Sequence, residues 1–259
     1  MPESKPKISV ITVVFNGVSS IEETVSNVLD QSYENLEYIV IDGGSNDGTQ
    51  DLIKKYQDKI SLWISEPDRG IYDAMNKGIA KASGEYVIFM NCGDKFYDAD
   101  TVKSFFIKNT NEDVIYGDTI LNTEGNMQFC KAKQIEMIKY GMPFCHQSVF
   151  VKLKLMKDRK FSLNYKLASD YDFFLSLYCD NKFTFKKIDN LVSIYDNCGA
   201  SMSLKTIEEK YIISKFYFSF SKSSAFHYYL LKYYTLTSFL KRKLPKKMVE
   251  RLVKFKREL

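Results

Sequence analysis

The stretch ISVITVVFNGVSSIEETVSNVLDQSYENLEYIVIDGGSNDG, residues 8–48, decides the fold. Apolar and β-branched residues fill two runs, 8–15 and 37–41, and residues 20–31 between them have the spacing of an amphipathic helix. Strands that are apolar at nearly every position are typical of parallel sheets covered by helices on both faces. The stretch therefore predicts a β-α-β unit.

The same alternation continues toward the C-terminus. The further elements expected in this half are helices at 49–56 and 71–82 and strands at 61–64 and 86–90. At the start of the first helix, Ser19 with Glu22 and Ser20 with Glu23 have the Ser-x-x-Glu spacing of a capping box.

After residue 94 the alternation becomes irregular, and from about residue 204 the pattern is helical. The elements expected here are helices near 100–108, 134–140 and 169–179, strands at 114–116, 119–121, 183–188 and 192–195, and a hairpin turn at 122–126. We therefore predict an α/β fold with a mostly parallel, doubly wound sheet, a smaller mixed sheet and a C-terminal helical extension.

Composition narrows the class of protein. With 259 residues, 45% of them hydrophobic, the chain is long enough for one large α/β domain and a small appendage. The five cysteines are scattered and lack C-x-x-C spacing, which argues against a disulfide framework and a thiolate zinc site. The first residues lack the apolar core of a signal peptide, and charges interrupt every apolar run before about 18 residues. We expect a soluble or peripheral protein of the cytoplasm.

Basic charge is concentrated at the end of the chain. The net charge of +5 is modest, but nine of the last twenty residues are Lys or Arg. An aromatic-rich stretch, 216–234, precedes them and favours an anionic membrane surface over nucleic acid as the partner. A solvated basic helix end beside an aromatic helical core is the alternative.

Polar residues and glycines follow four predicted strands. They are Asn16-Gly17 after the first strand, DGGSNDG (42–48) after the second, EPDRG (66–70) after the third and NCGD (91–94) after the fourth. Each segment alone is compatible with an ordinary turn. In an open parallel sheet, however, ligands bind beyond the carboxyl ends of the strands, and four such ends converge on one rim.

Two aspartates stand out on this rim. Asp42 ends an apolar strand, where a carboxylate is costly without a donor such as a ribose hydroxyl or a base N–H. The chain has no P-loop and no G-x-G-x-x-G motif, so a nucleotide must be held in another way. Asp94 is placed to coordinate Mg²⁺ or Mn²⁺ on a diphosphate, and two histidines are too few for a three-histidine zinc site. His146 is a candidate further ligand, with a structural histidine as the alternative.

Other charged residues complete the candidate site. Arg69 and Lys77 are candidates to neutralise a diphosphate, and Lys77 is equally compatible with a solvated helix position. Asp73 lies near the start of the same helix, where a carboxylate also interacts favourably with the helix dipole. Asp170 and Asp172 open a later apolar helix and point to different sides of it. One is a candidate general base, and a helix cap is the alternative for the pair.

Four segments together carry a resemblance to a known family. They are ISVITVVFN (8–16), VIDGGSNDGT (40–49), DRGIYDAMNKG (68–78) and NCGD (91–94). Over roughly residues 7–200, the combination resembles family 2 glycosyltransferases with the GT-A fold. Within that family it is most similar to bacterial enzymes that build O-antigen, capsule or colanic-acid repeat units.

The resemblance implies roles for particular residues. The metal motif, usually Asp-x-Asp, is NCGD (91–94) here, so that Asp94 alone supplies a carboxylate, with His146 as a further candidate. Asp170 corresponds to the catalytic base, with Asp172 as the alternative, because Ser replaces the Glu of the usual Glu-Asp pair. The residues implied in nucleotide or donor binding are Thr12, Val14, Asn16, Asp42, Asp68, Arg69, Asp73, Asn76, Asn91, Cys92 and Gly93.

The resemblance also implies an activity. It predicts an inverting hexosyltransferase that uses a UDP-sugar and Mn²⁺ or Mg²⁺, with a saccharide on undecaprenyl diphosphate as the acceptor in surface polysaccharide synthesis. Such an enzyme is expected at the cytoplasmic face of the inner membrane, with no nucleic-acid partner. We expect a GT-A domain over 1–203, in which 1–95 bind the nucleotide and 96–203 the acceptor, followed by the helical extension at 204–259.

Two other classes of protein remain as alternatives. A non-catalytic nucleotide-sugar-binding protein is compatible with the reduced metal motif. A sugar nucleotidyltransferase shares the α/β rim and its carboxylates, but it needs a basic glycine-rich loop after the first strand, which Asn16-Gly17-Val18 does not provide.

Overall fold

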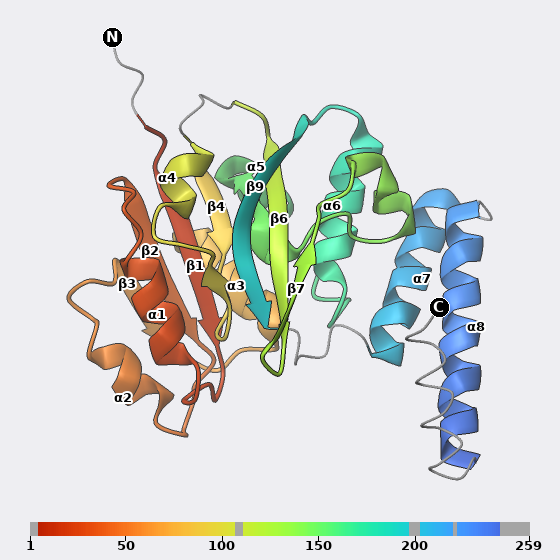
Figure 1. The fold of residues 1–259 in the computed structure, drawn as a ribbon, viewed down its shortest axis with the longest axis horizontal. Helices are drawn as coiled ribbons and strands as arrows, with labels where there is room; N and C mark the ends of the chain where they lie inside the picture. Colours follow the sequence, from red (N-terminus) through yellow and green to blue (C-terminus); the bar gives the residue numbers. More distant parts are fainter. Residues whose placement is uncertain (1–4, 107–110, 197–202, 220–221, 244–259) are drawn as a thin grey trace. The chain divides into compact units, whose positions relative to one another are not determined.

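The structure is a computed structural model that describes residues 5–106, 111–196, 203–219 and 222–243. The chain divides into two compact units, Met1–Gly199 and Ala200–Leu259. A sheet flanked by helices forms the first unit, and two helices form the second (Figure 1).

The first half of the sheet follows the predicted β-α-β alternation. Its elements are β1 (Ile8–Val14), α1 (Ile21–Leu29), β2 (Leu36–Asp42), α2 (Thr49–Lys54), β3 (Leu62–Ser65), α3 (Ile71–Lys81) and β4 (Tyr86–Phe89). β1 pairs in parallel with β2 and β4, and β2 pairs in parallel with β3, so the four strands end at the same edge. α1 lies on one face of these strands and α3 on the other (Figure 1).

The second half of the first unit adds strands to the same sheet. Its elements are β5 (Lys95–Phe96), α4 (Thr101–Phe105), β6 (Val114–Thr123), β7 (Asn126–Cys130), the 3-10 helices η1 (Ile135–Tyr140) and η2 (His146–Ser148), β8 (Val149–Lys152), α5 (Leu153–Arg159), α6 (Ser169–Asp180) and β9 (Phe185–Asp196). The strand order is β3-β2-β1-β4-β8-β6-β9-β5, with β7 paired to β6. The predicted α/β fold is confirmed, and its mixed part continues the parallel part as one nine-stranded sheet.

Several elements of this second half differ from the prediction. The strands expected at 114–116 and 119–121 are one strand, β6, and those expected at 183–188 and 192–195 are one strand, β9. A register shift in the β6–β9 pairing interrupts the apolar pattern and makes each strand look divided in the sequence. The element near 134–140 is a 3-10 helix, and the short elements β8 and α5 have no counterpart in the prediction.

The capping box predicted at the start of α1 is wrong. Ser20 is the N-cap residue, but its side chain makes no capping hydrogen bond. Glu22 forms an ion pair with Lys55 (3.3 Å), and Glu23 forms one with Lys95. These long-range ion pairs draw the two carboxylates away from the helix start.

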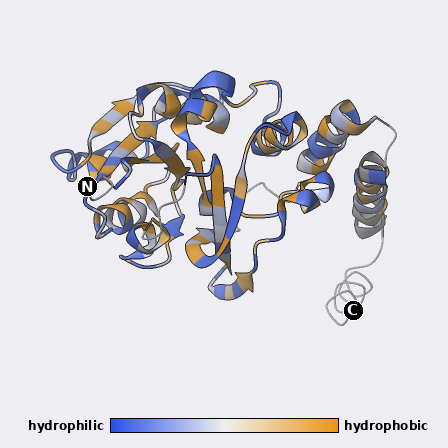
Figure 2. Ribbon diagram, turned by 90° about the horizontal axis from the view of Figure 1, so that it is seen from above, coloured by the Kyte–Doolittle hydropathy of each residue, from blue (hydrophilic) through white to orange (hydrophobic). Residues whose placement is uncertain are grey.

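The strands are the most apolar part of the first unit, as the hydropathy colours show (Figure 2). Every residue of β1 and β4 is buried, and Tyr38, Tyr86 and Tyr116 are among the largest fully buried side chains. Because close-packed interiors are stiff, polar groups at the carboxyl ends of these strands stand on a rigid support.

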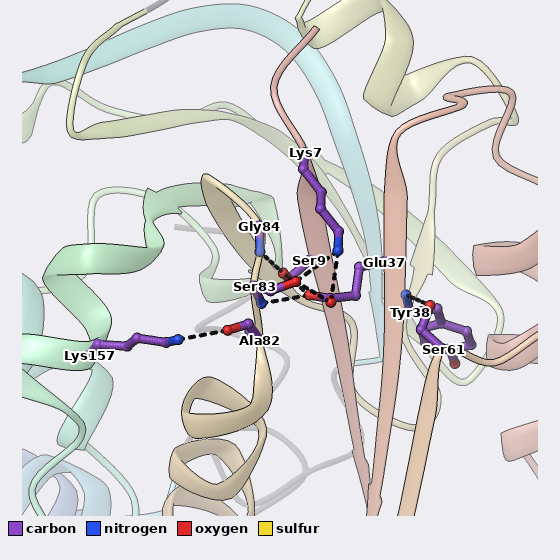
Figure 3. Close-up of polar contacts among 9 residues, drawn as sticks. All are labelled: Lys7, Ser9, Glu37, Tyr38, Ser61, Ala82, Ser83, Gly84 and Lys157. Atoms are coloured by element: carbon purple, nitrogen blue, oxygen red, sulfur yellow. Dashed lines mark hydrogen bonds and ion pairs between the residues drawn. The ribbon is translucent and has the colours of Figure 1, made fainter.

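At the opposite, amino ends of the strands, Glu37 ties three segments together (Figure 3). Its carboxylate accepts hydrogen bonds from Lys7 (3.0 Å), from Ser9 (2.5 Å) and from both the N–H (2.8 Å) and the hydroxyl (2.6 Å) of Ser83. Burial alone would raise the pKa of Glu37, but the hydrogen bonds outweigh it and lower the pKa to about 2. This cluster is a structural clamp at the end of the sheet that faces away from the rim.

In the described part of the second unit, α7 (Leu204–Phe218) and α8 (Lys222–Lys243) pack on each other. α7 begins after Ser203, whose hydroxyl accepts a hydrogen bond from the N–H of Thr206 (3.2 Å). Among the residues that the structure describes, no helix is long and apolar enough to cross a membrane. Of the basic segment predicted to contact a membrane, 241–259, residues 241–243 end α8 and residues 244–259 lie outside the described part of the chain.

Candidate active site

Hydrogen bonds join the loops after β1 and β2 into one wall of the rim. The N–H of Asn16 donates to the Ser45 hydroxyl (2.7 Å), and the side-chain oxygen of Asn16 accepts from the N–H of Asn46 (3.0 Å). The N–H of Gly17 donates to the Thr49 hydroxyl (2.9 Å). Asn16 has a left-handed backbone (φ 50°), a conformation that asparagine tolerates better than most residues. The predicted rim segments therefore form a structured surface.

Asp42 lies beneath this wall. Its side chain is fully buried, and its carboxylate accepts hydrogen bonds from the N–H of Ser45 (3.1 and 3.3 Å), from the Ser45 hydroxyl and from the Ser65 hydroxyl (2.6 Å). The protein itself thus supplies the donors that the sequence analysis expected from a ligand. Asp42 fixes the loop after β2 against the end of β3, and this geometry supports an indirect role in nucleotide binding.

Three other predicted binding residues are built into the interior. Thr12 is fully buried, and its hydroxyl contacts a tyrosine hydroxyl on β2 (3.0 Å) and the Met90 carbonyl (2.7 Å). Val14 is buried at the end of β1. The Asn76 amide donates to the carbonyl of Phe161 and accepts from its N–H, both at 2.9 Å. These contacts give the three residues structural roles, and their contact with a nucleotide stays a prediction.

The segment after β3 presents an accessible cation at the rim. Arg69 is 76% exposed, and its guanidinium pairs with Asp73 (2.9 Å), whose other oxygen accepts from the N–H of Arg69 (3.1 Å). Lys77 pairs with Glu66 (2.9 Å) on the same segment. Exposed ion pairs of this kind are weak, so Arg69 can exchange its partner for a diphosphate. Asp73 instead holds the start of α3.

Asp68 closes this segment onto the loop after β2. One carboxylate oxygen accepts from the N–H of Gly70 (2.8 Å). A Cβ at Gly43 would collide with the other oxygen, so the Asp68 carboxylate packs directly on the backbone of the loop after β2. The loops after β1, β2 and β3 are therefore in mutual contact, as the convergence of the strand ends predicts.

Asp94 is a buried carboxylate close to the end of β4. It is 3% exposed, and its two oxygens accept hydrogen bonds from the N–H of Asp196 (3.0 Å) and from the amide of Gln147 (2.9 Å). Burial raises the pKa of Asp94 to about 7, although both hydrogen bonds act in the opposite direction. A buried carboxylate in this state gains from a nearby cation, which fits a metal ligand.

Two further side chains with oxygen atoms, those of Asp196 and Asn91, belong to residues beside Asp94. A Cβ at Gly93 would lie 3.3 Å from a carboxylate oxygen of Asp196, and the charge of Asp196 contributes to the raised pKa of Asp94. The side-chain oxygen of Asn91 is buried and accepts no hydrogen bond from the described residues. One or two carboxylates, completed by substrate phosphates, are the usual setting of Mg²⁺. The residues therefore fit a divalent cation, although the described part of the chain holds no cluster of three or more His, Cys, Asp or Glu that could do so alone.

Cys92 and Gly93 shape the turn before Asp94. Burial, together with the charges of nearby carboxylates, raises the pKa of the Cys92 thiol to about 12. Gly93 has a backbone φ of 99°, which favours glycine, and its N–H donates to the Thr24 hydroxyl (3.0 Å). Both residues thus act on the site by holding the backbone beside Asp94.

Asp170, the candidate base, contacts Tyr72 from a distant part of the sequence. The Tyr72 hydroxyl, on α3, donates a 2.9 Å hydrogen bond to the Asp170 carboxylate at the start of α6. Burial raises the pKa of Tyr72, and the charge of Asp170 raises it further, so the hydroxyl is a constant donor. This contact joins the DRGIYD segment to α6 and favours Asp170 over Asp172 as the base.

His146 lies on the Asp170 side of the site. Its ring stacks on Phe89 (centroids 5.3 Å apart) and meets Phe161 edge-on (6.0 Å). Burial lowers the pKa of His146, the charge of Asp170 opposes that shift, and neither ring nitrogen has a hydrogen-bond partner among the described residues. The next residue, Gln147, is the one that contacts Asp94. This placement gives no support to His146 as a metal ligand and associates it with the base.

Three residues of the site escape the sequence analysis. Asp196 ends an apolar strand, so the rule that selected Asp42 and Asp94 would also have selected it. Tyr72 and Gln147 carry no such signal, because their partners are 98 and 53 residues away in the chain. Tyr72 and Gln147 could therefore be assigned to the site only from the folded structure.

Comparison with solved structures shows the fold. The chain resembles S. aureus TarS in complex with UDP-GlcNAc, with a TM-score of 0.64 and 20% identity over 80% of this chain and 65% of that chain. It also resembles the mannosyltransferase PcManGT from Pyrobaculum calidifontis in complex with GDP-Man and Mn²⁺, with a TM-score of 0.60 and 18% identity over 81% of this chain and 62% of that one. The chain therefore spans less than two thirds of these structures, and it shares their GT-A glycosyltransferase fold.

Sequence comparison then identifies the family. Residues 9–178 match Glycosyl transferase family 2, and the chain belongs to that family, as the resemblance predicted. A PGL/p-HBAD biosynthesis glycosyltransferase of Mycobacterium tuberculosis is 25% identical over 75% of this chain and 78% of its own. The putative teichuronic acid biosynthesis glycosyltransferase TuaG of Bacillus subtilis is 39% identical over 37% of this chain and 39% of its own.

Proposed function

We propose that this protein transfers a sugar from a UDP-sugar to a lipid-diphosphate-linked saccharide, with inversion at the anomeric carbon, in the synthesis of a surface glycan such as O-antigen or capsule. Family membership supplies the transferase class. The observation that carries the proposal is the Tyr72–Asp170 hydrogen bond, which joins a rim segment to the candidate base. UDP-GlcNAc on TarS supports a UDP-sugar donor, and the biosynthetic names of two relatives support a glycan product.

The residues that would hold Mn²⁺ or Mg²⁺ are Asp94, Asp196 and Asn91. A bound cation neutralises charge on the departing nucleoside diphosphate. Asp94 directly precedes β5 and Asp196 ends β9, the strand that pairs with β5, and the N–H of Asp196 donates to the Asp94 carboxylate (3.0 Å). Arg69, exposed at the rim, contributes a second positive charge toward the diphosphate.

In the proposed reaction, Asp170 accepts the proton of the acceptor hydroxyl while the oxygen attacks the anomeric carbon. The bond from that carbon to the diphosphate oxygen breaks on the opposite side, so an α-linked donor gives a β-linked product. Tyr72 donates to one oxygen of Asp170 and orients the carboxylate, which leaves the other oxygen for the acceptor. The His146 ring, stacked on Phe89, is close enough to Asp170 for the charge of that carboxylate to act on its pKa.

The lipid-linked acceptor is proposed from the charge distribution. Residues 200–259 carry fourteen Lys and Arg against four Asp and Glu, whereas residues 1–199 carry 23 against 28. Each basic residue near an anionic leaflet contributes about 1 kcal/mol of attraction. The second unit is therefore suited to the inner face of the inner membrane, where undecaprenyl-diphosphate saccharides are presented.

A panel of UDP-sugars with an undecaprenyl-diphosphate-saccharide analogue tests the proposal. We expect one donor to release UDP and to extend the acceptor, with the new linkage of opposite anomeric configuration by NMR. UDP binding without transfer from any donor would instead favour a nucleotide-sugar-binding protein. Retention of configuration would contradict Asp170 as the base of a single displacement.

A further inference from the structure

The helices α7 and α8 bury several polar side chains and expose many large apolar ones. The buried polar residues of this pair are Thr206, Glu209, Ser214, Ser224 and His227, beside the buried apolar residues Ile207 and Ile213. Eight large apolar residues of the described part of the pair are exposed, and the four most exposed are Ile212 (48%), Phe216 (76%), Tyr229 (71%) and Leu236 (58%). A helical pair built for water buries its large apolar side chains and exposes its polar ones.

The exposed apolar residues follow helical spacing. Ile212 and Phe216 are four residues apart on α7, and Tyr229 and Leu236 are seven apart on α8, so each pair lies on one face of its helix. Tyr233, also exposed, falls between the two α8 residues on the same face. The exposed residues thus form continuous stripes, which mark an interaction surface more strongly than scattered apolar residues do.

The charges beside these stripes indicate the kind of partner. The two helices carry eight basic residues against the two acidic residues Glu208 and Glu209; the basic residues are Lys205, Lys210, Lys215, Lys222, Lys232, Lys241, Arg242 and Lys243. An interfacial helix places Phe, Tyr and Leu in the outer acyl region and Lys among anionic headgroups. Neither described helix is apolar enough to span a bilayer, so the partner surface is the interface of the membrane and not its hydrocarbon centre.

We infer that the exposed apolar stripes of α7 (Ile212 and Phe216) and of α8 (Tyr229 and Leu236) insert into the interface of an anionic bilayer. The inference deepens the proposed function and rests on its membrane location, but it assigns the lasting attachment to apolar insertion. Salt distinguishes the two contributions, because it screens the attraction of basic residues and leaves apolar insertion intact.

Vesicle flotation with the full chain tests the inference. Vesicles with about 30% phosphatidylglycerol are used at about 50 and about 500 mM NaCl, where the Debye length falls from about 14 to about 4 Å. Three proteins are compared: wild type, Tyr229→Ser/Leu236→Ser, and the control Met127→Ser/Phe129→Ser. The control residues lie on β7 of the first unit and are similarly exposed (55% and 59%).

At high salt we expect the partition coefficients of wild type and control onto the vesicles to agree within about twofold. The partition coefficient of the Tyr229→Ser/Leu236→Ser variant is expected to be at least about tenfold lower. Equal partitioning of all three would overturn the inference, as would complete release of wild type by salt. A dimer of wild type and a monomer of the variant in light scattering, with unchanged partitioning, would assign the surface to a second copy of the chain.

A second measurement covers the case in which the serine variant folds poorly. Tyr229→Trp adds a fluorophore to the single native Trp63, and its emission is expected to shift to the blue and to be quenched by brominated lipid. Emission that vesicles leave unchanged would contradict insertion. Vesicle binding without sugar transfer would refute the proposed function alone, since flotation does not depend on turnover.

Discussion

The two sides of the rim differ in how their polar groups are satisfied. On the side of β1–β3, Asp42 and Asn16 are bonded to serines and backbone groups of neighbouring loops. On the side of β4 and α6, the Asn91 oxygen and both His146 nitrogens are buried without a partner among the described residues. A buried polar group left unpaired costs about 1–3 kcal/mol, so proteins keep such groups where a ligand completes them. The loops of the first side are held by their own hydrogen bonds and present the exposed Arg69 to a diphosphate. On the second side, we expect a cation and the acceptor to complete the unpaired groups.

The largest expected effect is at Asp170, on the incomplete side. Asp170→Asn removes the proton acceptor and retains the hydrogen bond from Tyr72, so kcat is expected to fall by about 10²–10⁴, the usual contribution of a general base. Calorimetry should show nearly unchanged UDP binding. Asp172→Asn, two residues along α6, is the matched control and is expected to stay within about threefold of wild type. The opposite ranking would assign the base to Asp172.

Asp94→Asn is expected to come next. It preserves the shape of the side chain and removes the charge that a cation requires, so kcat should fall by about 10², equivalent to a few kcal/mol of lost charge stabilisation. The Mn²⁺ concentration for half-maximal activity should rise in the same titration. Asp113→Asn, at a carboxylate paired with Lys152 (3.4 Å), serves as the control. An unchanged Mn²⁺ requirement in Asp94→Asn would place the cation elsewhere.

Tyr72→Phe tests whether the base is oriented by its neighbour. The lost hydrogen bond to a charged group is worth about 1.5–3 kcal/mol, and we expect a roughly tenfold decrease in kcat with little change in KM for the donor. An unchanged KM and an unchanged free energy of unfolding would show that the hydroxyl acts by orienting the base. The control is Tyr56→Phe, which removes a hydroxyl bonded to Glu22 (3.3 Å). A fall in kcat together with a lower free energy of unfolding would indicate a structural effect only.

The smallest effect on activity is expected at the amino ends of the strands, where Glu37 belongs to a finished cluster. Its pKa, lowered from 4.5 to about 2, contributes stability that is present above pH 4.5 and is lost as the pH falls toward 2. Glu37→Gln should therefore lower the free energy of unfolding by roughly 1–2 kcal/mol at pH 7, with the difference narrowing in acid. Urea unfolding at several pH values measures this, and the exposed Glu34→Gln is the control. If the folded Glu37→Gln protein lost activity at neutral pH, the Glu37 cluster would have a role in the reaction, which the account excludes.

The finished side of the rim could be predicted from the sequence in outline. The apolar runs of β1, β2 and β4 are strong signals because these strands are buried on both faces, and their ends converge by the geometry of a parallel sheet. What Asp42 contacts could not be predicted. A carboxylate at the end of an apolar strand suggested that a ligand donates a hydrogen bond to it. In the folded chain, Ser45 and Ser65 are the donors.

The incomplete side was harder to predict. Asp94 and Asp170 follow from local pattern and family resemblance, but the contact of Asp170 with Tyr72 joins residues that share no local pattern. His146 resembled a metal ligand by residue type alone, and its stacking on Phe89 depends on η2, an element of three residues with no periodic signal. The sequence analysis did not predict the β8–α5 segment for a similar reason. A strand of four residues is too short to show an alternation of apolar and polar residues.

The central claim is that a cation and a UDP-sugar supply the missing partners of the buried polar groups on the side of β4 and α6. The most direct measurement is UDP release from the preferred UDP-sugar in the presence of acceptor, with Mn²⁺, with EDTA, and with Mn²⁺ restored. We predict that UDP release is rapid with Mn²⁺, at least about 10²-fold slower in EDTA, and rapid again when Mn²⁺ is restored. The Asp94→Asn protein is expected to be slow under all three conditions. Equal turnover by wild type in Mn²⁺ and in EDTA would contradict the claim.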